Sequence, residues 1–240
     1  MSVDGYTSAP GQSAENPFGV GGMVLTEWVF ALRAFREEHG MEGGEDNAST
    51  QIIEQHFENI GASVMGRNMF GGGPGPWGDD PWMGFWGDNP PYHHPVFVLT
   101  HHPRESVEME GGTTFHFVTD GLESALAQAR EAAGGQDVSL GGGGTTARAA
   151  IAAGLVDDML ITIVPVFLGG GTRLFEDLGG APRRLSRSSR SRRRTSRICA
   201  FGFCEAHIAP RTIAAPTGWF QLTLSDRIVT PSSVEKIGIT

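Results

Sequence analysis

Cysteine is scarce in this sequence, and its scarcity excludes two common ways of stabilising a fold. Only Cys199 and Cys204 occur among the 240 residues. Two cysteines are too few for a disulfide framework or a zinc site, so we expect a reducing compartment. Lysine is scarcer still, since Lys236 is the only one. We interpret this as a compositional bias of the source genome, which carries no functional signal.

Long apolar runs are also missing. No stretch reaches the roughly 18 to 20 apolar residues that a membrane span requires. No charged segment followed by an apolar one opens the chain, as a signal peptide would. We therefore expect a cytoplasmic protein without a membrane partner. Hydrophobic residues make up 39% of the chain, which supports a real core in one α/β domain with appendages or in two small domains.

The charge is divided unevenly along the chain. Residues 1–181 hold 24 acidic residues and 7 arginines, whereas residues 182–240 hold 3 acidic and 11 basic residues. The main body is acidic, so we do not expect it to bind nucleic acid. The segment 183–197 is a low-complexity run of arginine and serine, a composition typical of disorder and sometimes of nucleic-acid binding. We divide the chain into a domain at 1–182 and a basic tail at 183–240.

The most informative segment is 138–151, VSLGGGGTTARAAI. A short apolar run ends in four glycines, Gly141 to Gly144, and a predicted helix follows. Glycine lacks a Cβ, so a ligand can approach its backbone closely. The first amides of a helix are unpaired and carry partial positive charge, which suits a phosphate. The pattern therefore indicates a nucleotide cofactor, although a tight connection without a ligand is the alternative.

Apolar segments rich in β-branched residues alternate with helical patterns of about ten residues. This rhythm predicts an α/β sheet, largely parallel, with helices on both faces. Ligands of such sheets bind at the carboxyl ends of the strands, where Arg67, Thr100 and the glycine turn are expected to share one cleft. Predicted strands cover 62–65, 95–100, 114–118, 138–140 and 158–166; predicted helices cover 25–35, 50–59 (ended by Gly61), 122–133 (capped by Asp120) and 146–153 (closed by Gly154).

A long loop at 71–94 is rich in glycine, proline and tryptophan. Its aromatic residues could cover a flat heteroaromatic substrate, or they could pack against the sheet or a second subunit. Two histidine pairs lie at 93–94 and 101–102, but no spacing of four residues on a helix and no cysteine partner supports a metal site. We expect no metal.

These features together resemble the dihydrofolate reductase-like superfamily. The closer resemblance is to the reductase domain at the C-terminus of bifunctional riboflavin-biosynthesis proteins. It extends from residue 1 to about 182 and implies a three-layer α/β/α fold with a mostly parallel, mixed central sheet. The segments that carry it are 1–5 (MSVDG), 64–70 (VMGRNMF), 96–102 (VFVLTHH), 118–120 (VTD), 141–145 (GGGGT) and 164–175 (VPVFLGGGTRLF).

The resemblance also implies an NADPH cofactor and site residues. The cofactor-binding candidates are Gly66, Arg67, Thr100, His101, His102, Gly141, Gly142, Gly143, Gly144 and Thr145. The candidates on the substrate side are Gly169, Gly170 and Gly171, near a substrate phosphate, and the carboxylates Asp4 and Glu54 as catalytic residues. Dihydrofolate reductases carry a helical carboxylate that aligns here near Thr50 or Gln51. Glu54, one turn later, could replace it or simply face solvent.

The implied activity is hydride transfer from NADPH to a small heterocyclic or ribosyl substrate. Reduction of 5-amino-6-(5-phosphoribosylamino)uracil, which turns its ribose into ribitol, is the best single expectation. A dihydrofolate or pterin reductase and a non-catalytic nucleotide-binding protein are the alternatives. Relatives often pair, so a homodimer is one expected assembly.

The resemblance stops at Pro182, where relatives continue into two more strands that complete the sheet. We expect these C-terminal strands to be missing, through a shift of reading frame in the coding sequence. Met1 falls where relatives are already finishing their first strand, so we expect that strand to be short.

Overall fold

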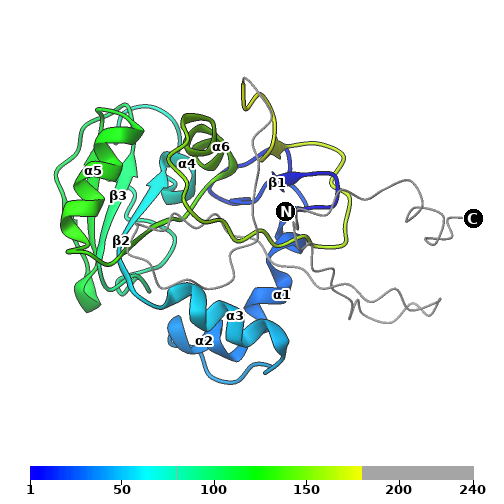
Figure 1. Cartoon of the computed structure of the whole chain (residues 1–240). Coiled ribbons are helices and arrows are strands. Elements are labelled where there is room, and N and C mark those ends of the chain that lie inside the picture. The colour runs from blue at the N-terminus through cyan, green and yellow to red at the C-terminus, as the bar shows by residue number, and fades with distance from the viewer. Residues whose placement is uncertain (80, 180–240) are drawn as a thin grey trace, which may run out of the picture.

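The fold was analysed in a computed structural model, which describes residues 1–79 and 81–179. Its centre is a five-stranded sheet in the order β4-β5-β3-β2-β6 (Figure 1). The strands are β2 (Ile60–Gly66), β3 (Pro95–Leu99), β4 (Val107–Glu108), β5 (Thr114–Val118) and β6 (Asp137–Leu140). Neighbours pair in parallel except at the β4 edge, where pairing is antiparallel. The predicted α/β class with a mixed, mostly parallel sheet is confirmed.

Both faces of the sheet are buried, because successive side chains of a strand point to opposite sides. Within β2, Ala62 and Val64 join one apolar cluster, whereas Met65 joins a second cluster on the other face. The first face is covered by α5 (Leu122–Ala132), which buries Leu126 among its alanines (Figure 1). The predicted strands at 62–65, 95–100, 114–118 and 138–140 are found, and so is the predicted helix at 122–133.

The tryptophan-rich loop covers the second face over β3 and β5. Phe70 and Phe115 are fully buried there, with ring centroids 5.0 Å apart. Trp77 packs edge-on against Phe70, and the Trp82 Nε1 donates a hydrogen bond to the Phe70 carbonyl at 2.8 Å. The loop therefore packs against the sheet, which was one of the alternatives drawn from the sequence.

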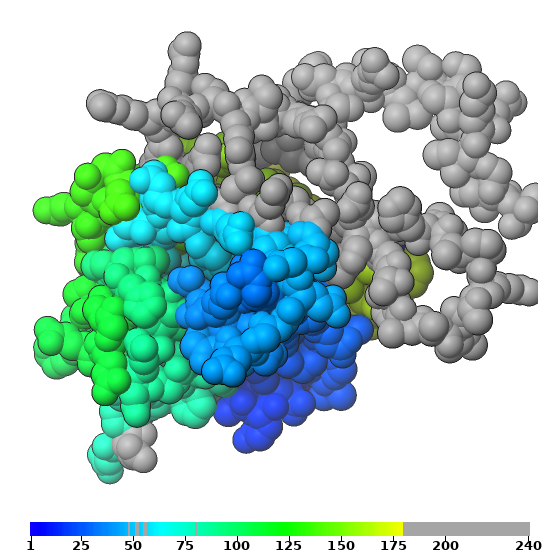
Figure 2. All heavy atoms as spheres, turned by 90° about the horizontal axis from the view of Figure 1, so that it is seen from below, coloured from blue at the N-terminus to red at the C-terminus, as the bar shows by residue number. Residues whose placement is uncertain are grey.

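The remaining helices precede β2 or flank its end, except for η2, which lies between β4 and β5. They are η1 (Gly22–Leu25), α1 (Glu27–Phe30), α2 (Arg33–Glu38), α3 (Ala48–Phe57), α4 (Arg67–Phe70), η2 (Glu110–Gly112) and α6 (Gly144–Ala153). A single helix over 25–35 is wrong, because Leu32 is extended (ψ 136°), buried, and bridged to Glu45. The helices α2 and α3 lie below the sheet in Figure 1 and form part of the face that Figure 2 presents.

Two predicted helix boundaries are wrong. Gly61 does not end α3, because the chain already leaves the helix at Glu58 (ψ 135°), and Asn59 takes the left-handed conformation (φ 64°). Gly61 instead lies in β2, where a Cβ would come within 2.7 Å of the Ala133 carbonyl oxygen. Asp120 does not cap α5, whose N-cap is Gly121 without a capping side chain. Gly154 does close α6 in the left-handed conformation (φ 72°), as predicted.

The predicted strand at 158–166 is also wrong. Among the described residues, its part at 162–166 pairs with Met1 to Val3, through an amino-terminal bond to the Thr162 carbonyl and backbone bonds at Val164 and Val166. Ile163 and Val164 are isolated bridge residues, and Val164 is bridged to Ser2, so the segment does not make a strand. A small antiparallel sheet of β1 (Tyr6–Ser8) and β7 (Thr172–Arg173) lies beside it and contacts α6.

Within the described ranges, none of the helices is both long enough and apolar enough to cross a membrane. The basic tail at 183–240, both cysteines, the expected loss of C-terminal strands and the suggested frame shift all lie outside the described residues.

Candidate active site

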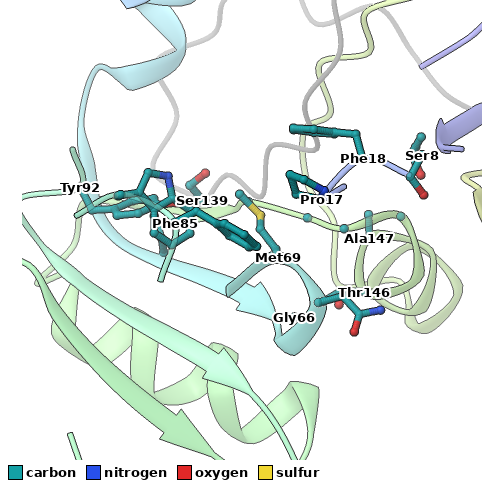
Figure 3. Close-up of a pocket in the computed structure, with 18 of the residues that line it drawn as sticks. Ser8, Pro17, Phe18, Gly66, Met69, Phe85, Tyr92, Ser139, Thr146 and Ala147 are labelled. Atoms are coloured by element: carbon teal, nitrogen blue, oxygen red, sulfur yellow. The ribbon is translucent and has the colours of Figure 1, made fainter. Parts of the chain in front are cut away.

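A cavity of about 1620 Å³ opens at the carboxyl ends of β2, β3 and β6. Figure 3 shows it between the end of β2, the start of α6 and the N-terminal segment that carries Ser8, Pro17 and Phe18. Its volume exceeds the roughly 300–1000 Å³ of a typical single-ligand pocket, so it has room for a cofactor and a substrate together. All ten residues expected to bind the cofactor line it: Gly66, Arg67, Thr100, His101, His102, Gly141, Gly142, Gly143, Gly144 and Thr145.

The glycine turn is fastened to the end of β2. The Gly141 amide donates to the Val64 carbonyl at 2.9 Å, and the Gly66 amide donates to the Gly142 carbonyl at 3.0 Å. Gly142 has a φ of 101°, which favours glycine. The helix α6 begins directly after the turn, at Gly144. Its first amides have no backbone acceptor in the part of the chain that the structure describes, so they present partial positive charge to the cavity.

The glycines of this cradle have no side chains, and at two of them there is no room for a Cβ. A Cβ on Gly144 would collide with the side chain of Thr7 and come within 3.0 Å of Thr172, and a Cβ on Gly66 would collide with the Thr146 hydroxyl. Gly143, by contrast, faces open space within 4 Å of where its Cβ would lie. A backbone cradle with one open side fits a diphosphate that approaches closely.

Arg67 connects the cavity to the tryptophan-rich loop. Its Nε donates to the Gly71 carbonyl at 3.0 Å, and its two terminal nitrogens donate to the Gly72 carbonyl and to the Thr100 hydroxyl, each at 3.2 Å. A guanidinium has five N–H donors, so two remain for a ligand. Arg67 therefore both fastens the loop and keeps donors at the edge of the cavity.

Two further side chains extend this cluster. Trp77 stacks on the Arg67 guanidinium, 3.1 Å from carbon to ring centroid, and its Nε1 donates to the His102 carbonyl at 2.9 Å. Arg104 lies 4.8 Å from the same ring. Burial, followed by the charge of Arg104, lowers the pKa of Arg67. Neither arginine has a carboxylate within ion-pair distance among residues 1–79 and 81–179, so their positive charge is uncompensated there.

Thr100 connects the end of β3 to the end of β5 and to the His102 backbone. It is 8% exposed, its amide donates to the Val118 carbonyl, and its hydroxyl accepts from the His102 amide at 3.2 Å. His101 is exposed and His102 half-buried, both beside the cavity. This arrangement places hydrogen-bond donors and imidazole rings where a ribose phosphate could lie.

Asp4 and the glycines 169–171 lie together but not in this cavity. The Asp4 carboxylate accepts from the amides of Gly169 at 2.8 Å and Leu168 at 3.2 Å. The pKa of Asp4 is lowered to about 2, chiefly by a hydrogen bond from the Ser2 side chain and further by these two amides, while desolvation, the second-largest effect, opposes them. None of Asp4, Gly169, Gly170 and Gly171 lines the cavity that holds the cofactor-binding candidates.

Glu54 is not brought to the cavity either. It is exposed on α3 and lines a separate depression with Arg33 and Asp46. Glu38, also exposed, is the only carboxylate among the described residues that line the main cavity. No group of three or more histidine, cysteine, aspartate or glutamate side chains that could hold a metal is present within the described residues.

Sequence reasoning missed several residues of this site. Trp77 and Arg104 do not line the cavity, but they stack beside Arg67 at its edge, Trp77 because the long loop folds back and Arg104 because the segment after β3 passes the same ring. Thr7 and Thr146 were missed because their contacts with the glycines depend on how β1 and α6 meet. A serine within each apolar strand, Ser63 and Ser139, was a visible signal that was not used.

The chain matches the model of a known protein family. The family model described as the RibD C-terminal domain matches residues 1–199, which is most of the chain. No curated protein matches the chain closely enough to count as a relative.

Proposed function

Because the chain belongs to the RibD C-terminal domain family, a family of NADPH-dependent reductase domains, we propose that it reduces 5-amino-6-(5-phosphoribosylamino)uracil with NADPH. The product would carry a ribityl group in place of the ribosyl group. One observation supports this proposal above the others: the glycine turn, Arg67 and Thr100 lie around a single cavity large enough for two ligands.

The residues present fit a dinucleotide. The free amides at the start of α6 and the open side of Gly143 would hold the diphosphate, with Thr145 beside them. The two remaining donors of Arg67 reach the same edge. A bound nicotinamide would supply the hydride that this reduction needs, and a proton from solvent would complete it.

The preference for NADPH over NADH rests on charge. Arg67 and Arg104 lie near Thr100, His101 and His102 without a neutralising carboxylate in the described chain. An additional phosphate on the adenosine ribose would find charge-assisted donors here. We propose that this end of the cavity holds that phosphate.

A pterin or dihydrofolate substrate is less well supported. Protonation of a pterin requires an acid in the cavity, and Asp4, Glu54 and the other described carboxylates apart from the exposed Glu38 do not line it. The low pKa of Asp4 keeps it ionised near neutral pH, so it suits anchoring of the 168–169 amides better than proton donation.

The experiment is a titration of the full chain with NADPH and with NADH, followed by tryptophan fluorescence, and then a turnover assay. We expect quenching by NADPH at lower concentration than by NADH, and oxidation of NADPH only when the aminouracil substrate is added. Dihydrofolate serves as the comparison substrate. Binding without turnover on either substrate would favour a nucleotide-binding protein, and faster turnover of dihydrofolate would overturn the proposed substrate.

A further inference from the structure

A row of three polar side chains crosses the sheet-side wall of the cavity, away from the glycine turn. It consists of Ser139 on β6, Ser63 on β2 and His94, which immediately precedes β3. All three line the same cavity as the cofactor-binding candidates. Ser63 and Ser139 are register partners in the parallel pairing of β2 and β6, so their side chains lie next to each other on one face.

Ser63 and His94 already form a pair. The Ser63 Oγ lies 2.8 Å from the His94 Nε2, and Ser63 is 3% exposed. Burial, followed by the charge of the neighbouring His93, lowers the pKa of His94 to about 4. The imidazole is therefore neutral near pH 7, with one donor and one acceptor nitrogen.

Ser139 has no such partner. It is 6% exposed, and its hydroxyl makes no hydrogen bond within the described chain. Figure 3 shows its side chain among the residues that line the pocket, on the same side as Tyr92 and Phe85. Among the described residues only the Thr162 hydroxyl is both buried and unpartnered, so the Ser139 hydroxyl still reaches the open space of the cavity, where it can bond to a ligand.

The surroundings of the row are flat and apolar. Phe85, Trp86 and Tyr92 line the cavity beside it, with the Trp86 and Tyr92 rings 5.1 Å apart, edge to face. Ile53 and Phe57 of α3 line the cavity as well. Aromatic and aliphatic walls around a few fixed polar groups are typical of sites for planar ligands.

We propose that Ser139, Ser63 and His94 form a subsite for the hydrogen-bonding edge of a flat, uncharged heterocycle. Adjacent parallel strands lie about 4.8 Å apart, about twice the spacing of successive C=O and N–H groups on an imide edge, so neighbouring members of the row can bond to alternate groups along that edge. The proposal rests on the proposed function, because it assigns the ring of that substrate to this wall.

The subsite is adjacent to the cofactor cradle and distinct from it. Ser139 lies two residues before Gly141, and Ser63 lies three before Gly66. At about 3.3 Å per residue of strand, these hydroxyls are roughly 7 to 10 Å back from the glycine turn. A ring held at the row and a dinucleotide held at the turn can therefore occupy the cavity together.

The experiment uses lumazine, a fluorescent bicyclic imide, and 1,3-dimethyllumazine, whose imide edge is blocked by methyl groups. Their binding to the full chain is measured by fluorescence polarisation, and NADPH binding is measured on the same samples by tryptophan quenching. The test variant is Ser139→Ala, which removes only the unpartnered hydroxyl. The matched control is Ser8→Ala, because Ser8 is also buried (5% exposed) and lines the opposite wall (Figure 3).

We expect lumazine to bind, and Ser139→Ala to weaken that binding about 5- to 10-fold, as the loss of one buried hydrogen bond does. Ser8→Ala should bind lumazine like the unmodified chain, and dimethyllumazine should bind weakly and equally to all three. Lumazine binding that is absent, or unchanged by Ser139→Ala, overturns the subsite. If the unmodified chain still binds NADPH in that case, the proposed reductase function survives. If the unmodified chain does not bind NADPH, the function itself is contradicted.

Discussion

The guanidinium carbon of Arg67 lies 3.1 Å from the centre of the Trp77 ring. The same guanidinium donates hydrogen bonds to the carbonyls of Gly71 and Gly72 and to the hydroxyl of Thr100. One side chain thus joins the end of β2, the start of the tryptophan-rich loop and the end of β3. The edge of the sheet at which we place the cofactor phosphate is held in shape by this contact.

Replacement of Arg67 by lysine tests this double role. A single ammonium cannot supply the planar fork that reaches Gly71, Gly72 and Thr100 together, and it stacks less well on Trp77. We expect Arg67→Lys to weaken NADPH binding about tenfold, or about 1.4 kcal/mol, and to lower the melting temperature. Tryptophan fluorescence titration and thermal unfolding measure the two effects.

The control for this change is Arg148→Lys. Arg148 lies on α6 outside the cavity, and its polar contacts with described residues are long, at 3.4 Å to the Arg173 carbonyl and 3.7 Å to Glu176. It should bind NADPH like the unmodified chain. Equal NADPH affinities of Arg67→Lys and the unmodified chain would remove Arg67 from the proposed site.

Gly144 allows a test of the cradle through its packing. A Cβ there would collide with the Thr7 side chain, which donates a hydrogen bond to the Thr172 carbonyl at 3.0 Å. We expect Gly144→Ala to lower the free energy of unfolding by about 1 to 3 kcal/mol, because overpacking displaces β1 from α6. Urea unfolding measures the change.

A double substitution identifies the cause. Thr7→Ala removes the colliding hydroxyl, so Gly144→Ala should cost less in a Thr7→Ala background than in the unmodified chain. Strictly additive losses would show that the two residues do not meet as the structure places them.

The elements that the sequence predicted correctly are those with local signals. The strands β2, β3, β5 and β6 are short apolar runs, and α5 and α6 carry a helical apolar spacing. The segment 158–166 has an equally apolar pattern, but a strand also needs a neighbour, and within the described chain its backbone pairing partners are Met1 to Val3 alone. Pairing of this kind depends on distant parts of the chain, so composition alone does not reveal it.

The site residues also divide into those with a local signal in the sequence and those without one. The glycine turn and Arg67 follow from local chemistry and from the family resemblance, and they do line one cavity. Asp4 was placed by resemblance alone, and it anchors the 168–169 backbone outside that cavity. The stack of Trp77 on Arg67 and the pair of Ser63 with His94 could not be foreseen, since each joins residues brought together by the path of the long loop or by strand register.

Thr162 carries the one buried side-chain oxygen or nitrogen that lacks a hydrogen-bond partner in the described part of the chain. It is 2% exposed. Valine has nearly the same shape and no hydroxyl to desolvate, so we expect Thr162→Val to raise the free energy of unfolding by about 1 kcal/mol. Chemical unfolding of the purified chain measures it.

Thr113 is the matched control, because it is a buried threonine whose hydroxyl is hydrogen-bonded. It is fully buried, and its hydroxyl accepts from the His93 amide at 2.9 Å and donates to the Pro90 carbonyl at 3.1 Å. The same threonine-to-valine change at this position should cost about 1 to 3 kcal/mol, because it leaves both partners unpaired. Stability changes of the same sign at the two positions would contradict the hydrogen bonding described for them.

The stability of the chain should depend on pH through His94. Burial and His93 lower its pKa from 6.5 to about 4 in the folded state, so between these values the unfolded chain binds more protons than the folded one. The free energy of unfolding therefore decreases as the pH falls from about 6.5 towards 4, and this decrease is complete below the folded-state pKa. Because the ring is partly exposed, we expect about 1 to 3 kcal/mol from this residue rather than the full value of the shift.

Replacement of His94 by glutamine isolates this contribution. Glutamine can still bond to Ser63 but does not titrate, whereas His39 and His116, whose pKa values burial also lowers, remain in both proteins. Urea unfolding at pH 7 and at pH 4.5 should show a smaller loss of stability for His94→Gln than for the unmodified chain. Equal losses would mean that His94 is not buried in its neutral form beside Ser63, and the polar row on the cavity wall would lose its central pair.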